Sequence, residues 1–312
     1  MLISDGGGNL PTPVLRDADR IHVSISKAGE IVDTTDIGTA TQALANKRVT
    51  AAERTAIRNI LAGMAEIRSQ VASGSAIDQA ITGVEGITLR VDASPAANQG
   101  RVLVPPTNPF VTLKGSDANP NVLFPRDVAV HELTHLVQEG VSGAGIGTRG
   151  GREQRGMGGA TNFNAVSVGE GLADSESMLT TKSTASGGEY LGPKGIYKSV
   201  RDFAHPSGDR HVFQKVSTNY NEVNHNAGDP HEYGGVVAEI FLEVSKKSSN
   251  AQALVALHGV FEDPAFAASN QGWLELRDSL KLQADAARDR ADPVLAAAIE
   301  TSLNDHGLST TE

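Results

Sequence analysis

The segment His131-Glu132-Leu133-Thr134-His135 constrains this chain more than any other, because its two histidines can act together only on a helix. Residues four apart lie on one face of an α-helix, one turn from each other, so the two imidazoles can close on one metal ion. Glu132 is displaced around the helix and can reach a water on the open side of that ion. Apolar neighbours such as Val128 and Val130 predict a helix over 126–139 that is buried on several sides.

Two imidazoles and a carboxylate on a buried helix need polar partners, and a metal ion would supply them. The chain has no cysteine, so any zinc site must use His nitrogen and carboxylate oxygen. Catalytic zinc keeps one position for water and lowers the pKa of that water toward 7. Glu132 would then take the proton of the water and later deliver it to a leaving amine. The alternative is a helix whose histidines serve packing or capping.

A third protein ligand has to come from elsewhere in the chain. The metzincin pattern is excluded, because Gln138 and Val141 stand where it needs Gly and His. The best candidate is Glu170 in the segment 169–174, where Asp174 follows four residues later on the same helix face. One carboxylate can bind the metal while the other accepts the N–H of a ligand histidine. The alternative is a solvent-exposed acidic face.

Hydrophobic periodicity predicts a mixed N-terminal part and a mostly helical C-terminal part, an α+β organisation that we divide at 1–125 and 126–312. Thr50 and Glu53 form an expected capping box at the start of a helix. The other expected elements are strands at 21–26, 87–91 and 101–104, helices at 49–71, 166–179, 274–287 and 293–303, a helical pattern from 235 onward, and a glycine-rich loop at 140–159.

The charge and the apolar content limit the partners. The net charge of −10 argues against nucleic acid or an anionic membrane. No apolar run approaches the length of a membrane helix, and the start of the chain does not have the pattern of a secretory leader. We expect a monomer that is secreted without a cleaved leader or whose leader lies outside this sequence; a cytoplasmic protein is the alternative.

Taken together, RDVAVHELTHLVQEG at 126–140 and GEGLAD at 169–174 resemble the gluzincin zinc peptidases of the thermolysin and fungalysin type. Segments similar to the family follow in the expected order at 199–206, 229–244 and 273–308, and more weakly at 97–100. The glycine-rich loop is longer than in thermolysin, and the N-terminal third is far from the family pattern. The resemblance implies a thermolysin-like zincin fold, with an active-site cleft between a β-containing N-terminal lobe and a mainly helical C-terminal lobe.

The resemblance also implies one zinc ion and a peptide or protein substrate. The site residues it implies are the metal ligands His131, His135 and Glu170, the catalytic residues Glu132 and His231, the supporting residues Asp174 and Asp229, and the substrate-binding residues Arg201 and Asn98. His225 is an alternative to His231. Calcium is left open, because 175–188 holds a single acid where the family often has an acidic calcium cluster, although Asp127 keeps one position.

We therefore expect a zinc metalloendopeptidase. One alternative is a secreted or injected effector or toxin protease with the same chemistry and a narrow target. Another is a catalytically inactive binding module with a zincin fold. An aminopeptidase ranks lower, because no amine-binding acidic motif is evident upstream of the zinc motif.

Overall fold

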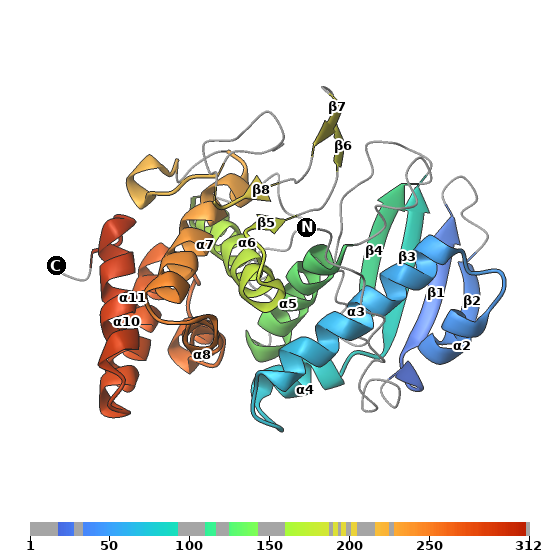
Figure 1. Ribbon diagram of the computed structural model, residues 1–312, viewed down its shortest axis with the longest axis horizontal. Coiled ribbons are helices and arrows are strands. Elements are labelled where there is room, and N and C mark those ends of the chain that lie inside the picture. The colour runs from blue at the N-terminus through green and yellow to red at the C-terminus, as the bar shows by residue number, and fades with distance from the viewer. Residues whose placement is uncertain are drawn as a thin grey trace, which may run out of the picture.

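The structure, a computed structural model, describes residues 18–27, 34–92, 110–116, 125–142, 160–186, 190–192, 195–197, 201–204, 216–224 and 228–309. This part of the chain is mixed α/β and mostly helical, with the strands of the main sheet in the N-terminal part and a set of packed helices in the C-terminal part (Figure 1). Among its helices, none combines the length and the apolar character needed to cross a membrane.

The main sheet has four strands in the order β2-β1-β3-β4. Its strands are β1 (His22–Lys27), β2 (Thr34–Thr39), β3 (Gly86–Asp92) and β4 (Phe110–Ser116). Strand β2 runs antiparallel to β1, whereas β1, β3 and β4 are parallel. Val23 pairs with Ile87 and Ile25 with Leu89, and all four side chains are buried, as alternation along a half-buried strand requires.

Three helices connect β2 to β3: α2 (Ala40–Ala45), α3 (Ala51–Ser69) and α4 (Ala76–Thr82). The capping box expected at the start of α3 is confirmed, because the Thr50 side chain accepts from the Glu53 backbone and the Glu53 side chain accepts from the Thr50 backbone. The apolar face of α3, including Ile57 and Ile60, belongs to the same hydrophobic core as the strands. This packing positions α3 and α4 as a support for the next helix along the chain.

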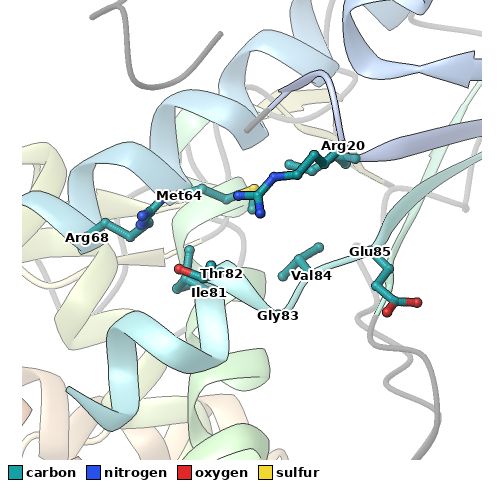
Figure 2. Close-up of a pocket in the computed structure, with 9 residues that line it drawn as sticks. Arg20, Met64, Arg68, Ile81, Thr82, Gly83, Val84 and Glu85 are labelled. Carbon is teal, nitrogen blue, oxygen red and sulfur yellow. The ribbon is translucent and has the colours of Figure 1, made fainter. Parts of the chain in front are cut away.

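A hollow of about 500 Å³ lies between α3, the turn after α4 and the residues before β1. Figure 2 shows Arg20 and Arg68 with Met64 along one side of it and the turn around Gly83 along the other. The Nε of Arg68 donates to Asp78 at 3.0 Å. None of the residues expected in the metal site lines this hollow.

The remaining helices form the C-terminal part: α5 (Arg126–Ser142), α6 (Ala160–Thr181), α7 (Pro230–Lys247), α8 (Asn250–Phe261), α9 (Pro264–Ala268), α10 (Trp273–Asp289) and α11 (Pro293–Asp305). Helix α5 packs against α3 and α4 on one side and against α6 on another. Helix α6 in turn packs along α7, which contacts α8 and α11. This order places α5, α6 and α7 side by side in the middle of the molecule (Figure 1).

Short strands and one 3₁₀ turn lie between α6 and α7: β5 (Ala185–Ser186), β6 (Tyr190–Gly192), β7 (Gly195–Tyr197), β8 (Arg201–Asp202) and the turn at Tyr220–Glu222. Strand β5 pairs with β8, which ties Arg201 to the end of α6. The pair β6–β7 forms a separate antiparallel hairpin.

The structure corrects several expected boundaries. The glycine-rich loop was placed too early, because Gly140 continues α5 to Ser142; the rest of that loop, and the strand expected at 101–104, lie outside the described residues. Helix α6 begins at Ala160, six residues before the expected start, and α4 and β4 were not anticipated. Gly307 ends helix α11, because its φ is 81° and the Leu308 N–H donates to the Leu303 carbonyl.

Candidate metal centre

Three neighbouring helices bring the site residues together. Helix α5 carries His131 and His135 one turn apart, α6 carries Glu170, and α7 carries His231 in its first turn. Asp229 caps α7, because its Oδ1 accepts the backbone N–H of His231 at 3.0 Å, and Pro230 follows at the position where a helix tolerates proline. The start of α7 therefore fixes the place of the His231 side chain.

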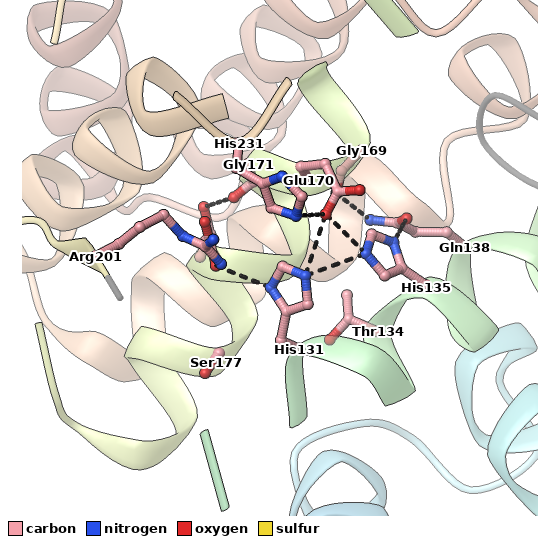
Figure 3. A network of polar contacts seen from close by, with 12 residues as sticks. His131, Thr134, His135, Gln138, Gly169, Glu170, Gly171, Ser177, Arg201 and His231 are labelled. Atoms are coloured by element: carbon pink, nitrogen blue, oxygen red, sulfur yellow. Dashed lines mark hydrogen bonds and ion pairs between the residues drawn. The ribbon is translucent and has the colours of Figure 1, made fainter. Parts of the chain in front are cut away.

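The two motif histidines and Glu170 form a compact triangle of ligand atoms (Figure 3). The Nε2 atoms of His131 and His135 are 3.2 Å apart, and Oε2 of Glu170 lies 3.2 Å from the first and 3.1 Å from the second. Ligands of a tetrahedral zinc ion at about 2.0–2.1 Å stand roughly 3.3–3.4 Å from one another. The observed triangle therefore fits one face of a zinc tetrahedron, with the fourth position left to a further ligand.

His231 approaches the same carboxylate oxygen. Its Nε2 lies 3.1 Å from Oε2 of Glu170, and its ring stacks on that of His131 with centroids 6.2 Å apart. His131, Glu170 and His231 thus form a second set of potential ligand atoms, all within 4.8 Å of one another. A buried group of this composition could bind a metal ion. Both sets share His131 and Glu170 and differ in which histidine completes them.

Each imidazole is oriented by an acceptor at its other nitrogen. Nδ1 of His131 lies 2.8 Å from Asp174, Nδ1 of His135 lies 3.0 Å from the side-chain oxygen of Gln138, and Nδ1 of His231 lies 3.1 Å from Asp229. With a proton on Nδ1, Nε2 is the nitrogen that each ring can offer to a metal ion once the ring is neutral. This arrangement is the one by which proteins fix the tautomer of a metal-binding histidine.

The carboxylates control the protonation of the site. Burial alone lowers the pKa of His131, but Asp174 and Glu170 outweigh it and raise that pKa to about 10. Burial also lowers the pKa of His231, but Glu170 and Asp229 outweigh it and raise that pKa to about 9. The pKa of Glu170 falls well below its usual value, because His231, His135 and His131 together outweigh its burial. A metal ion must therefore displace protons from the imidazoles in order to bind.

Arg201 lies behind the site and contacts Asp174. Its guanidinium donates to Oδ1 of Asp174 at 2.7 Å, the same oxygen that faces His131. The pKa of Asp174 falls to about 2, because the charges of Arg201 and His131 outweigh the effect of burial. Asp174 is thus a carboxylate at neutral pH, which makes the neighbouring imidazole of His131 a stronger ligand.

Close packing of α6 and α7 sets the distance between Glu170 and His231. Gly171 and Gly234 meet at the crossing of the two helices, where a Cβ on Gly171 would lie 2.3 Å from the carbonyl oxygen of Gly234 and 2.6 Å from Cβ of Val237. Only glycine permits this approach. Gly171 directly follows Glu170 in the sequence, but its partner on α7 is visible only in the structure.

The structure brings together most of the site residues expected from the sequence. His131, His135, Glu170, Asp174, Arg201, Asp229 and His231 form one contact network, and Glu132 is buried on α5 between the two histidines. Asn98 and His225 lie outside the described residues. Gln138 was missed as a contributor; its position three residues after His135, on the same helix face, is the signal that could have indicated it.

Comparison with known proteins assigns neither a family nor a function to this site. No protein-family model matches the chain, and no curated protein matches it significantly.

Proposed function

We propose that the chain is a zinc-dependent endopeptidase that hydrolyses peptide bonds, with Glu132 as general base. The observation that carries the proposal is the triangle of His131 Nε2, His135 Nε2 and Glu170 Oε2 with sides of 3.1–3.2 Å. A set of two imidazoles and one carboxylate with an open fourth position is a donor set of catalytic zinc. A zinc ion held there would polarise the scissile carbonyl and acidify a water.

Side chains of the protein would carry out the other steps of the reaction. Glu132, one position from the first ligand, would accept the proton of the attacking water and deliver it to the leaving amine. His231, held by Asp229 at 3.1 Å, would donate a hydrogen bond from Nε2 to the oxyanion of the tetrahedral intermediate. Asp174 and Arg201 would hold the imidazole of His131 in place, and Arg201 and Asn98 are proposed to contact the peptide main chain.

We further propose that the two parts of the molecule are arranged as in thermolysin-like zincins. The parallel strands and α3 would form one lobe and α6 to α11 the other, with α5 between them. An extended peptide would then bind along the edge of the sheet near α5. The resemblance of 126–140 and 169–174 to gluzincins supports this arrangement.

The proposal is tested by comparing the parent chain with Glu132→Gln on denatured casein, with cleavage sites read by mass spectrometry and bound zinc measured on the same samples. We expect Glu132→Gln to keep one zinc ion and to lose activity by about 10²–10⁴-fold. Glu139→Gln, on the same helix, is the matched control and should retain both. A chelator should abolish cleavage by the parent chain, and added zinc should restore it.

The outcomes separate the alternatives. If Glu132→Gln cleaves casein at the parental rate, the proposed mechanism is wrong. If the parent chain binds zinc but cleaves neither casein nor a broad peptide library, the inactive binding module or a protease with a narrow target replaces the general endopeptidase. A protease with a narrow target would still cleave its own substrate in a zinc-dependent way.

A further inference from the structure

We propose that Gln138 is a positioning residue that joins the two helices bearing the metal ligands and holds His135 in the tautomer that binds metal. This inference deepens the proposed function and rests on it. Gln138 lies on α5, three residues after His135, and only 3 % of it is exposed. Its side chain contacts both the ring of His135 and the backbone beside Glu170 (Figure 3).

The orientation of the Gln138 amide follows from its partner on α6. Its Nε2 donates to the carbonyl oxygen of Gly169 at 3.0 Å, and a carbonyl can only accept. The other end of the amide must therefore be the oxygen, which lies 3.0 Å from Nδ1 of His135. Because an amide oxygen can only accept, Nδ1 of His135 must carry the proton. In the neutral ring, Nε2 is then the nitrogen that can bind a metal ion, and it lies on the side of Glu170.

The same amide also fixes the spacing between ligands on different helices. Gly169 is the residue directly before Glu170, so the bond from Gln138 ties the backbone of one ligand to the ring of another. The side chain of Gln138 thus helps to hold His135 Nε2 and Glu170 Oε2 at their separation of 3.1 Å. His135 and Gly169 are both buried, so water has no easy access to replace Gln138.

The two ligand histidines are held by different chemistry. His131 faces the charged Asp174, which is supported by Arg201, whereas His135 faces a neutral amide anchored on backbone. A second carboxylate in place of Gln138 would face the Gly169 carbonyl, and two acceptors at 3.0 Å repel each other. An amide is the group that satisfies an N–H on one side and a carbonyl on the other.

Three variants test this role. Gln138→Met keeps the length of the side chain but loses both bonds, so we expect its zinc affinity to fall by about 10–100-fold. Gln138→Glu keeps an acceptor for His135 and loses the donor to Gly169, so its affinity should fall less. Gln138→Asn keeps the amide but is too short to span both partners; it serves as the test if Gln138→Met does not fold.

Zinc affinity is measured by competition with a chromophoric chelator on the full chain, and folding by circular dichroism. The visible absorption of the cobalt-substituted protein gives a second readout, which should change in Gln138→Met because the ring of His135 is no longer fixed. Gln271→Met is the matched control. Gln271 is also buried, and its Nε2 donates to the carbonyl of Ala267 at 3.2 Å, away from the metal site. It should bind zinc like the parent.

Unchanged zinc affinity and an unchanged cobalt spectrum in folded Gln138→Met, or in Gln138→Asn where that variant replaces it, would overturn the role of Gln138 and leave the metal centre intact. A parent chain that binds no zinc would overturn the metal centre and this inference with it. Equal losses in Gln138→Met and Gln271→Met would also overturn it, because the effect would then come from general loss of a buried amide.

Discussion

The crossing of α6 and α7 offers a sharp test of how the fold positions the site. In Gly171→Ala the new Cβ would lie 2.3 Å from the Gly234 carbonyl oxygen and 2.6 Å from Cβ of Val237, where ordinary contacts begin at 3.4 Å. The helices would have to separate by about 1 Å to restore normal contact distances. The distance from His231 Nε2 to Glu170 Oε2 would then rise from 3.1 Å to about 4 Å, beyond the reach of a hydrogen bond.

Gly171→Ala should lower the cleavage activity more than it lowers the free energy of unfolding. Overpacking lowers the free energy of unfolding by about 1–3 kcal/mol, whereas replacing glycine by alanine inside a helix raises it by about 1 kcal/mol. The three proposed zinc ligands lie on α5 and α6, whereas the separation occurs between α6 and α7, so zinc should still bind. Cleavage should fall by about 10²–10³-fold, the usual effect of losing one donor to the oxyanion. The assay compares bound zinc, melting temperature and turnover of a quenched-fluorescence peptide.

Gly63→Ala is the control for a glycine at a helix contact. A Cβ at Gly63 would come closer than 3.4 Å only to side-chain methyl groups of Leu133 and Val130, at 3.0 and 3.2 Å, and these can shift. It should leave turnover nearly unchanged. The reasoning is refuted if Gly171→Ala keeps parental turnover, or if it loses zinc in parallel with activity.

His231→Gln should retain zinc and lower turnover by about 10²–10³-fold; loss of zinc instead would make His231 a metal ligand. In the metal-free protein the raised pKa of His131 stabilises the fold most fully below about pH 6.5, and this contribution is lost as the pH rises through about 10. Glu170 has a lowered pKa and is ionised at both pH 6 and pH 8, so only the protons of the imidazoles compete with zinc. Zinc should therefore raise the melting temperature more at pH 8 than at pH 6, and calorimetry should detect proton release on binding. An equal rise in melting temperature at both pH values would contradict this. Glu176→Gln removes the negative charge from the buried ion pair with His258, whose atoms lie 2.9 Å apart, and should cost about 3–5 kcal/mol in chemical denaturation. The cost should be less at high pH, where the raised pKa of His258 is passed and the parent itself loses the ion pair. A penalty that does not depend on pH would count against the ion pair.

Local patterns gave much of the fold. The helix after Thr50 was predictable because its start signal and its apolar periodicity agree, and the helix around His131 because the metal hypothesis and the apolar flanks point to the same structure. The early part of α6 was missed because Ala160–Ala165 has neither a cap signal nor a clear apolar stripe, and its helix depends on packing against α7. Strand β4 was missed because turn residues surround it on both sides.

The ligand atoms of the site were predictable because histidines four apart and carboxylates four apart share a helix face by geometry alone. The contacts between helices were not predictable in the same way. The bond from Gln138 to Gly169 joins residues 31 apart in sequence, and the approach of His231 to Glu170 depends on the meeting of Gly171 and Gly234. Such contacts follow from how helices cross, which one sequence does not encode in any local pattern.

The central claim is that His131, His135 and Glu170 hold one zinc ion. A crystal of the zinc-loaded protein, measured on both sides of the zinc absorption edge, tests it most directly. The account predicts one anomalous peak per chain at about 2.0–2.2 Å from Nε2 of His131, Nε2 of His135 and an oxygen of Glu170. No peak at this site, or a peak bonded to His231 and not to His135, would contradict it.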